Sequence, residues 1–149
     1  MRRAGWALGA VLVLLLAPGC GRSAGEEFRE DELRPLEQRL DVQRARIAAT
    51  LRVVRSRNAR DARALREDVD ALAGTVREVE GLEPPSEASA EFGAYVRALR
   101  ELVAALRVFP AALRRGERAS VDAVSRRVQD ATGQVQQRSE QLERRLLDV

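Results

Sequence analysis

The chain has 149 residues and a formal net charge of +3, from 26 basic and 23 acidic side chains. It contains no histidine, one cysteine (Cys20) and 3% aromatic residues, and every basic side chain is arginine. This composition excludes a His/Cys metal site and a Ser-His or Cys-His nucleophile pair. Neither a GxGxxG motif nor a P-loop spacing occurs, so we expect a non-catalytic protein without a metal or cofactor.

The N-terminus has the order of an export signal. Met1-Arg2-Arg3 supplies positive charge, and the 14 residues from Ala4 to Ala17 carry none. A membrane-spanning helix needs about 20 apolar residues, so this run is too short to be one. A basic start, a short apolar run and small residues at the cut are typical of a secretory signal. We predict that residues 1–19 are a signal peptide.

The segment Leu16-Ala17-Pro18-Gly19-Cys20 resembles the lipobox of bacterial lipoproteins. Gly19 matches the small residue before the cut, whereas Ala17 and Pro18 depart from the usual pattern. The resemblance implies a mature chain that begins at Cys20 and carries acyl chains such as palmitate. Lipoproteins that stay in the inner membrane often have aspartate directly after the cysteine, whereas this chain has Gly21. The resemblance therefore implies the periplasmic face of the outer membrane in a cell with two membranes. The alternative is an ordinary signal with Cys20 as a free or intermolecularly bridged thiol.

Residues 20–25 are expected to form a lipidated tether, and residues 26–149 a helical domain rich in Ala, Leu, Arg, Glu and Gln. The first tract, residues 26–80, has apolar residues at steps of three and four, which is typical of a helix. With no Gly or Pro near Asn58, the pattern favours one long helix over two shorter ones. Its apolar stripe consists of Leu33, Leu36, Leu40, Ile47, Leu51, Val54, Ala62, Leu65, Val69, Leu72, Val76 and Val79.

Two further helices follow. Pro84-Pro85 breaks the chain after the first tract, and either Ser86 or Ser89 can cap the second helix that follows. Pro110 should kink or end it. A turn at Gly116 leads to a third helix from about Ala119, whose heptad stripe consists of Val121, Val124, Val128, Ala131, Val135, Leu142 and Leu146.

These elements predict an all-α fold, namely an antiparallel three-helix bundle with a long first helix. Residues 26–51 would then form a stalk that pairs with a second copy. In the alternative, a four-helix bundle, they fold back onto the rest of the chain. Aromatic residues Phe92, Tyr95 and Phe109 are expected in the core, although they could instead line a ligand pocket.

Charge is segregated along the chain. The three-helix fold would gather acidic residues at the Pro84 end and arginines at the Gly116 end. The arginine-rich end could bind an anionic partner, since guanidinium groups suit phosphate, or could simply be a solvated face. A mature net charge of +1 and few aromatic residues argue against nucleic acid. The candidate patch comprises Arg52, Arg55, Arg57, Arg60, Arg114, Arg115 and Arg118.

The sequence therefore favours a lipid-anchored, non-catalytic protein of the cell envelope with a structural or adaptor role through helix-helix contacts. In style, though not in motif, the mature part resembles small coiled-coil lipoproteins of bacterial envelopes. Its expected partners are the membrane, through the anchor, and a second copy or another envelope protein. Two alternatives stay open. One is a module whose arginine-rich end grips an anionic polymer, lipid phosphate or acidic protein, and the other is a helical bundle that binds a small apolar ligand.

Overall fold

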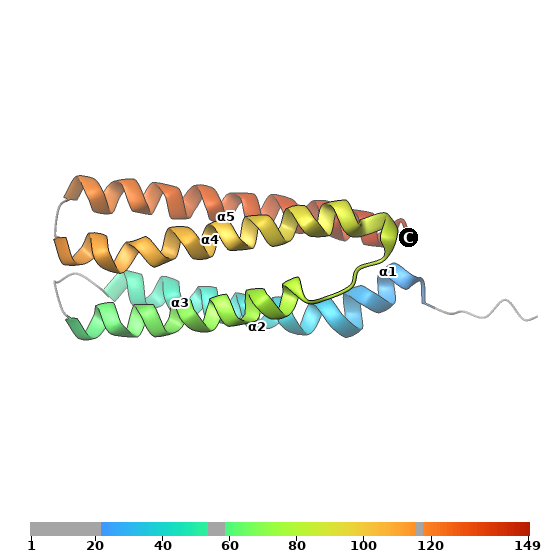
Figure 1. Ribbon diagram of the computed structural model, residues 1–149, viewed down its shortest axis with the longest axis horizontal. Coiled ribbons are helices and arrows are strands. Elements are labelled where there is room, and N and C mark those ends of the chain that lie inside the picture. The colour runs from blue at the N-terminus through green and yellow to red at the C-terminus, as the bar shows by residue number, and fades with distance from the viewer. Residues whose placement is uncertain (1–21, 54–58, 116–117) are drawn as a thin grey trace, which may run out of the picture.

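The computed structural model describes residues 22–53, 59–115 and 118–149, and Figure 1 shows these as long helices lying side by side. The all-α class is confirmed, since no strand occurs within these ranges. The helical elements are α1 (Ala24–Glu27), η1 (Phe28–Leu33), α2 (Arg34–Val53), α3 (Ala59–Glu80), η2 (Ser86–Ala88), α4 (Ser89–Arg115) and α5 (Arg118–Leu147).

Elements α2 and α3 lie antiparallel, and polar contacts fix their register. Arg39 Nη2 lies 2.9 Å from Glu78 Oε1, and Gln43 Nε2 donates to Thr75 Oγ1 at 3.0 Å. Higher residue numbers on α2 thus meet lower ones on α3. This differs from the single straight helix expected over residues 26–80. Asn58 and the rest of 54–58 lie outside the described residues, so the structure does not describe the expected continuity there.

The first tract contributes to the same core as the rest of the chain. Leu33, Leu40 and Ile47 are buried in one cluster with residues of α3, α4 and α5. All described members of the predicted stripe are buried or half-buried, which confirms the 3.6-residue pattern. Leaving these leucines in water would forfeit about 1.5–3 kcal/mol each, which is the physical reason for their packing. The arrangement fits the four-helix alternative.

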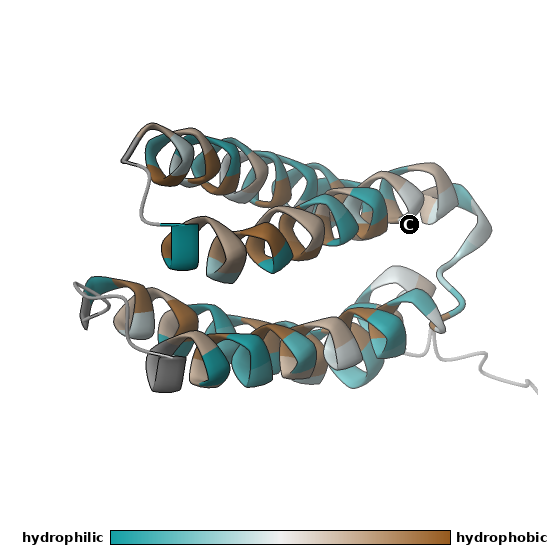
Figure 2. Ribbon diagram, turned by 60° about the vertical axis from the view of Figure 1, so that its left-hand side comes forward, coloured by the Kyte–Doolittle hydropathy of each residue, from teal (hydrophilic) through white to brown (hydrophobic). Residues whose placement is uncertain are grey.

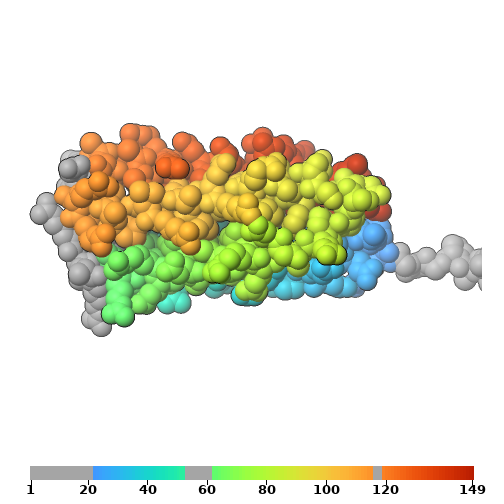
Figure 3. Space-filling view, viewed as in Figure 1, coloured from blue at the N-terminus to red at the C-terminus, as the bar shows by residue number. Residues whose placement is uncertain are grey.

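Helix α4 is the central packing element of the fold. It packs against both α3 and α5, and Figure 3 shows that side chains fill the space between the ribbons of α3 and α4. Figure 2 shows the apolar side of each helix turned inward. Pro110 does not end this helix: it is buried inside α4, which continues to Arg115.

The chain enters the bundle earlier than the sequence indicated. Ser23 is the N-cap, and its side chain and that of Glu26 form a capping box, so the helix begins at Ala24. Gly25, expected in a tether, is buried against Leu146. The π-helical turn η1 has i→i+5 bonds. It brings Phe28 and Leu33, five residues apart, into the core together.

Substitution by alanine should change the stability of the protein in opposite directions at two glycines. At Gly25 a Cβ atom would overlap the backbone carbonyl of Leu146, so Gly25→Ala should cost about 1–3 kcal/mol. At Gly133 a Cβ atom meets nothing within 4 Å, so Gly133→Ala should stabilise the helix by about 1 kcal/mol. Urea unfolding of both variants measures the two effects. Equal effects would contradict the close approach of α1 to the end of α5.

Candidate functional site

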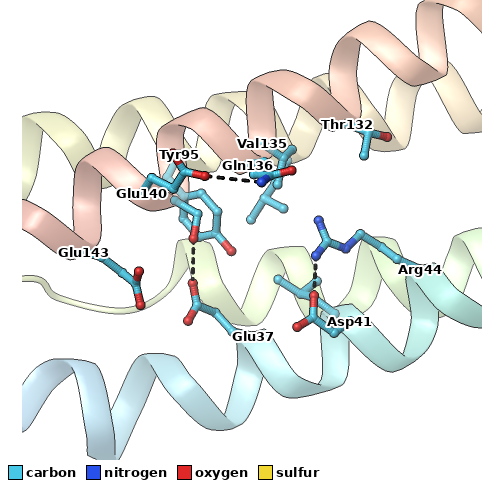
Figure 4. A pocket seen from close by; sticks show the side chains of 12 residues that line it. Glu37, Asp41, Arg44, Tyr95, Thr132, Val135, Gln136, Glu140 and Glu143 are labelled. Atoms are coloured by element: carbon cyan, nitrogen blue, oxygen red, sulfur yellow. Dashed lines mark hydrogen bonds and ion pairs between the residues drawn. The ribbon is translucent and has the colours of Figure 1, made fainter.

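A groove runs between α2 and α5, with α4 as its floor (Figure 4). These two helices are not closely packed, in contrast to the α2–α3, α3–α4 and α4–α5 pairs. The groove has an acidic part of about 400 Å³ and an apolar part of about 280 Å³. Arg44 and Thr132 line both parts, so the two are continuous.

The acidic part contains four carboxylates. Glu37 and Asp41 project from α2, and Glu140 and Glu143 from α5. Asp41 is paired with Arg44 in the groove. Glu143 lies 3.8 Å from the guanidinium of Arg29.

Glu37 is half-buried, and its hydrogen-bond donors are uncharged. Ser139 Oγ donates to Glu37 Oε1 at 3.4 Å, and the Tyr95 hydroxyl, from the floor of the groove, also bonds this carboxylate. Burial raises the pKa of the Glu37 carboxyl, and the Glu143 carboxylate raises it further, while the two hydroxyls lower it in part. Burial, and then Glu37, raise the pKa of Tyr95. Among the described residues, Glu37 thus forms no ion pair with a cationic side chain.

The apolar part lies nearer the other end of the groove. Ile47 and Leu51 of α2 face Val128 of α5 across a floor of Leu102 and Leu106. Leu51 and Val128 are only half-buried, although both belong to predicted core stripes. The apolar stripes of α2 and α5 therefore remain partly open to solvent here.

The arginine patch is only partly described. Arg52, Arg114 and Arg115 are exposed at the end of the bundle where α2 and α4 finish, at the left of Figure 1. Arg55 and Arg57 lie outside the described residues, as does Cys20. Arg60 and Arg118 belong to the first turns of α3 and α5 at this end, but their side chains are not described.

The sequence did not predict the groove. Of the three aromatic residues considered for a pocket, only Tyr95 lines it. Phe92 is in the core, where its ring meets that of Phe28 edge-on at 5.7 Å, and Phe109 is buried there as well. A usable signal was present at Arg138 and Ser139, where polar residues interrupt the heptad stripe between Val135 and Leu142. Such an interruption indicates a helix face that is not packed.

Within the described ranges, no group of three or more His, Cys, Asp or Glu side chains is placed to hold a metal ion. No described helix is long and apolar enough to cross a membrane. Comparison with known proteins yields no match to a family model, a curated sequence or a solved structure.

Replacing Glu37 by glutamine should stabilise the protein at neutral pH. Because the pKa of Glu37 is raised on folding, its favourable contribution is present below the ordinary glutamate pKa and is lost as pH rises through the folded value. Glutamine keeps a hydrogen-bonding group without the buried charge. Thermal unfolding at several pH values should show an advantage for Glu37→Gln at pH 7 that disappears near pH 4. A variant less stable at pH 7 would contradict this account.

Proposed function

We propose that this is a lipid-anchored, non-catalytic protein of the cell envelope that acts as an adaptor, receiving a helix of a partner in the α2–α5 groove. The observation that carries the proposal is the groove, where the apolar stripes of two helices stay partly open between polar walls. Helical grooves of this kind bind amphipathic helices. The fold thus offers a surface for the helix-helix contacts expected from the sequence.

We also propose that the first helical run is a fourth helix of the bundle rather than a stalk. Burial of Leu33, Leu40 and Ile47 in the common core supports this. The polar contacts of Arg39, Gln43 and Arg46 with α3 also support it. The groove depends on this arrangement, because α2 forms one of its walls.

The anchor proposed at Cys20 would orient the bundle. The helical run begins at Ala24, only four residues after Cys20, so acyl chains there hold the end containing α1 and η2 close to the membrane. The run from Ala24 to Val53 then extends about 45 Å at 1.5 Å per residue. If the axis of this run points away from the membrane, the groove lies in the periplasm. The proposed location of the anchor is the outer membrane.

A second candidate function rests on the arginine-rich end. No ion pair joins Arg52, Arg114 or Arg115 to a carboxylate among the described residues, whereas arginines nearer the other end, such as Arg39 and Arg100, are paired. Exposed guanidinium groups of this kind suit an anionic partner. In the proposed orientation this end points away from the anchoring membrane, which favours an anionic polymer or acidic protein over the headgroups of that membrane.

The anchor is tested by the N-terminus of the native protein. Mass spectrometry should find a mature chain that begins at Cys20 with added acyl mass, because two or three chains are needed for stable anchoring. Cys20→Ser should move the protein out of the membrane fraction. An unmodified Cys20, or a cut elsewhere, would contradict the proposal.

The adaptor role is tested by photo-crosslinking in cells of origin. A photoreactive residue at Gln136, on the groove wall, should give discrete crosslinked products. The matched control is Gln134, which is also exposed on α5 but does not line the groove. Equal products from both positions, or none from Gln136, would argue against docking in the groove.

A further inference from the structure

The two parts of the α2–α5 groove differ in charge and polarity along its length. Carboxylates gather where α2 begins, and aliphatic side chains gather toward its end. An occupant lying along the groove therefore meets an acidic surface over one half of its length and an apolar surface over the other.

In the acidic half, the lining side chains among the described residues carry more negative than positive charge. Glu37 is bonded to hydroxyl groups, and the Glu140 carboxylate accepts the Gln136 amide at 3.2 Å, while the Glu140 backbone carbonyl accepts from Arg144 Nε. Neither forms an ion pair among the described residues, whereas Asp41 and Glu143 each have an arginine nearby. A partly buried carboxylate gains most from a charged hydrogen-bond donor. The missing complement is a cation that enters from outside.

The dimensions favour a helix as the occupant. The wall formed by α2 rises by 14 residue steps from Glu37 to Leu51, or about 21 Å at 1.5 Å per step. An occupying helix of four turns would match that length. Its side chains at steps of three and four would reach the floor formed by α4. The floor is lined by the polar side chain of Tyr95 in the acidic half and by the apolar side chains of Leu102 and Leu106 in the apolar half.

We propose that the groove binds an amphipathic helix of a partner protein that carries arginine or lysine on its contact face at one end and leucine-like residues on the same face at the other. The basic end lies over Glu37 and Glu140, and the apolar end lies over Leu51 and Val128. This inference rests on the proposed adaptor function and names the chemistry of its partner.

The test uses the native protein in neutral phosphatidylcholine vesicles and synthetic 16-residue peptides with fluorescent labels. One peptide carries the arginine-plus-leucine face, a second has glutamate in place of arginine, and a third has the first composition in scrambled order. Fluorescence anisotropy should show binding of the first peptide at least ten times tighter than of either control, with subtraction of binding to empty vesicles.

Variants then assign the site. The double variant Glu37→Gln/Glu140→Gln should bind the arginine peptide about ten times more weakly and should bind the glutamate peptide no more weakly than the native protein does. The control Glu101→Gln, at an exposed site on α4 outside the groove, should change neither affinity. Val128→Asp should abolish binding in the apolar half, and Val42→Asp, at a 70% exposed position, should not. Circular dichroism confirms that each variant is folded.

Several outcomes would overturn the inference. Equal binding of the three peptides, or an unchanged affinity in the Glu37/Glu140 double variant, would remove the basic helix as the occupant. Binding of dodecylammonium, but of no peptide, would assign the groove to a small amphiphile instead. If crosslinks from Gln136 persist while no peptide binds, the adaptor function stands and only the chemistry of the partner is wrong.

Discussion

Leu72→Asp should unfold the protein or leave it barely stable. Leu72 is fully buried in α3 within the common core, away from the groove. The substitution removes a leucine that contributes about 2–5 kcal/mol and buries a carboxylate without a partner. The total loss approaches the 5–15 kcal/mol by which native domains are stable. Circular dichroism during urea unfolding measures it.

The control for this prediction is Val108→Asp. It makes the same kind of change at an exposed position of α4, so it should shift stability by no more than about 0.5 kcal/mol. A folded Leu72→Asp protein with native stability would contradict the proposed packing of α3.

Leu33→Glu should destabilise the whole bundle by about 4 kcal/mol or more. Leu33 is 1% exposed and lies at the end of η1, in the segment that the sequence alone assigned to a stalk. Because its side chain belongs to the common core, the charge should lower the unfolding midpoint of the entire cooperative transition. Urea unfolding followed by far-ultraviolet circular dichroism would show this shift.

The same helical run offers its own control in Val42→Glu, at a 70% exposed site, which should be close to neutral. If residues 26–51 formed a self-pairing stalk instead, Leu33→Glu would dissociate oligomers and leave the unfolding midpoint of the remaining bundle unchanged. Light scattering beside the unfolding curve separates these two outcomes.

Much of the fold could be predicted from periodicity and breakers. The stripe of leucines and valines in the first tract identified the core face, and Pro84-Pro85 marked the connection before α4. Local signals were less informative where the outcome depends on tertiary packing. No Gly or Pro lies near Asn58, which favoured a continuous helix although Asn58 itself interrupts the apolar stripe. The cost of leaving Leu33 and Leu40 in water nevertheless favours their packing against other helices.

The candidate site was harder to predict, since it depends on which helices fail to pack closely. The spacing of Tyr95 on α4 is that of a core residue, and its position beside Glu37 follows from the arrangement of three helices. A five-residue step from Phe28 to Leu33 fits no regular α-helix, and only the π-helical turn explains it. The sequence showed the blocks of like charge. It did not show which carboxylates would form no ion pair with an arginine among the described residues.

We infer that the first helical run lies back along α3, where it completes the bundle and forms one wall of the groove. A distance between spin labels at Gln38→Cys and Arg77→Cys, in a Cys20→Ser background, tests this most directly. Both positions are exposed, near the register of the Arg39–Glu78 pair. Packed helices lie about 8–10 Å apart, so pulsed electron resonance should give one distance well below about 30 Å. A continuous helix would separate the labels by about 58 Å, and that result, in protein diluted with unlabelled chains, would contradict the account.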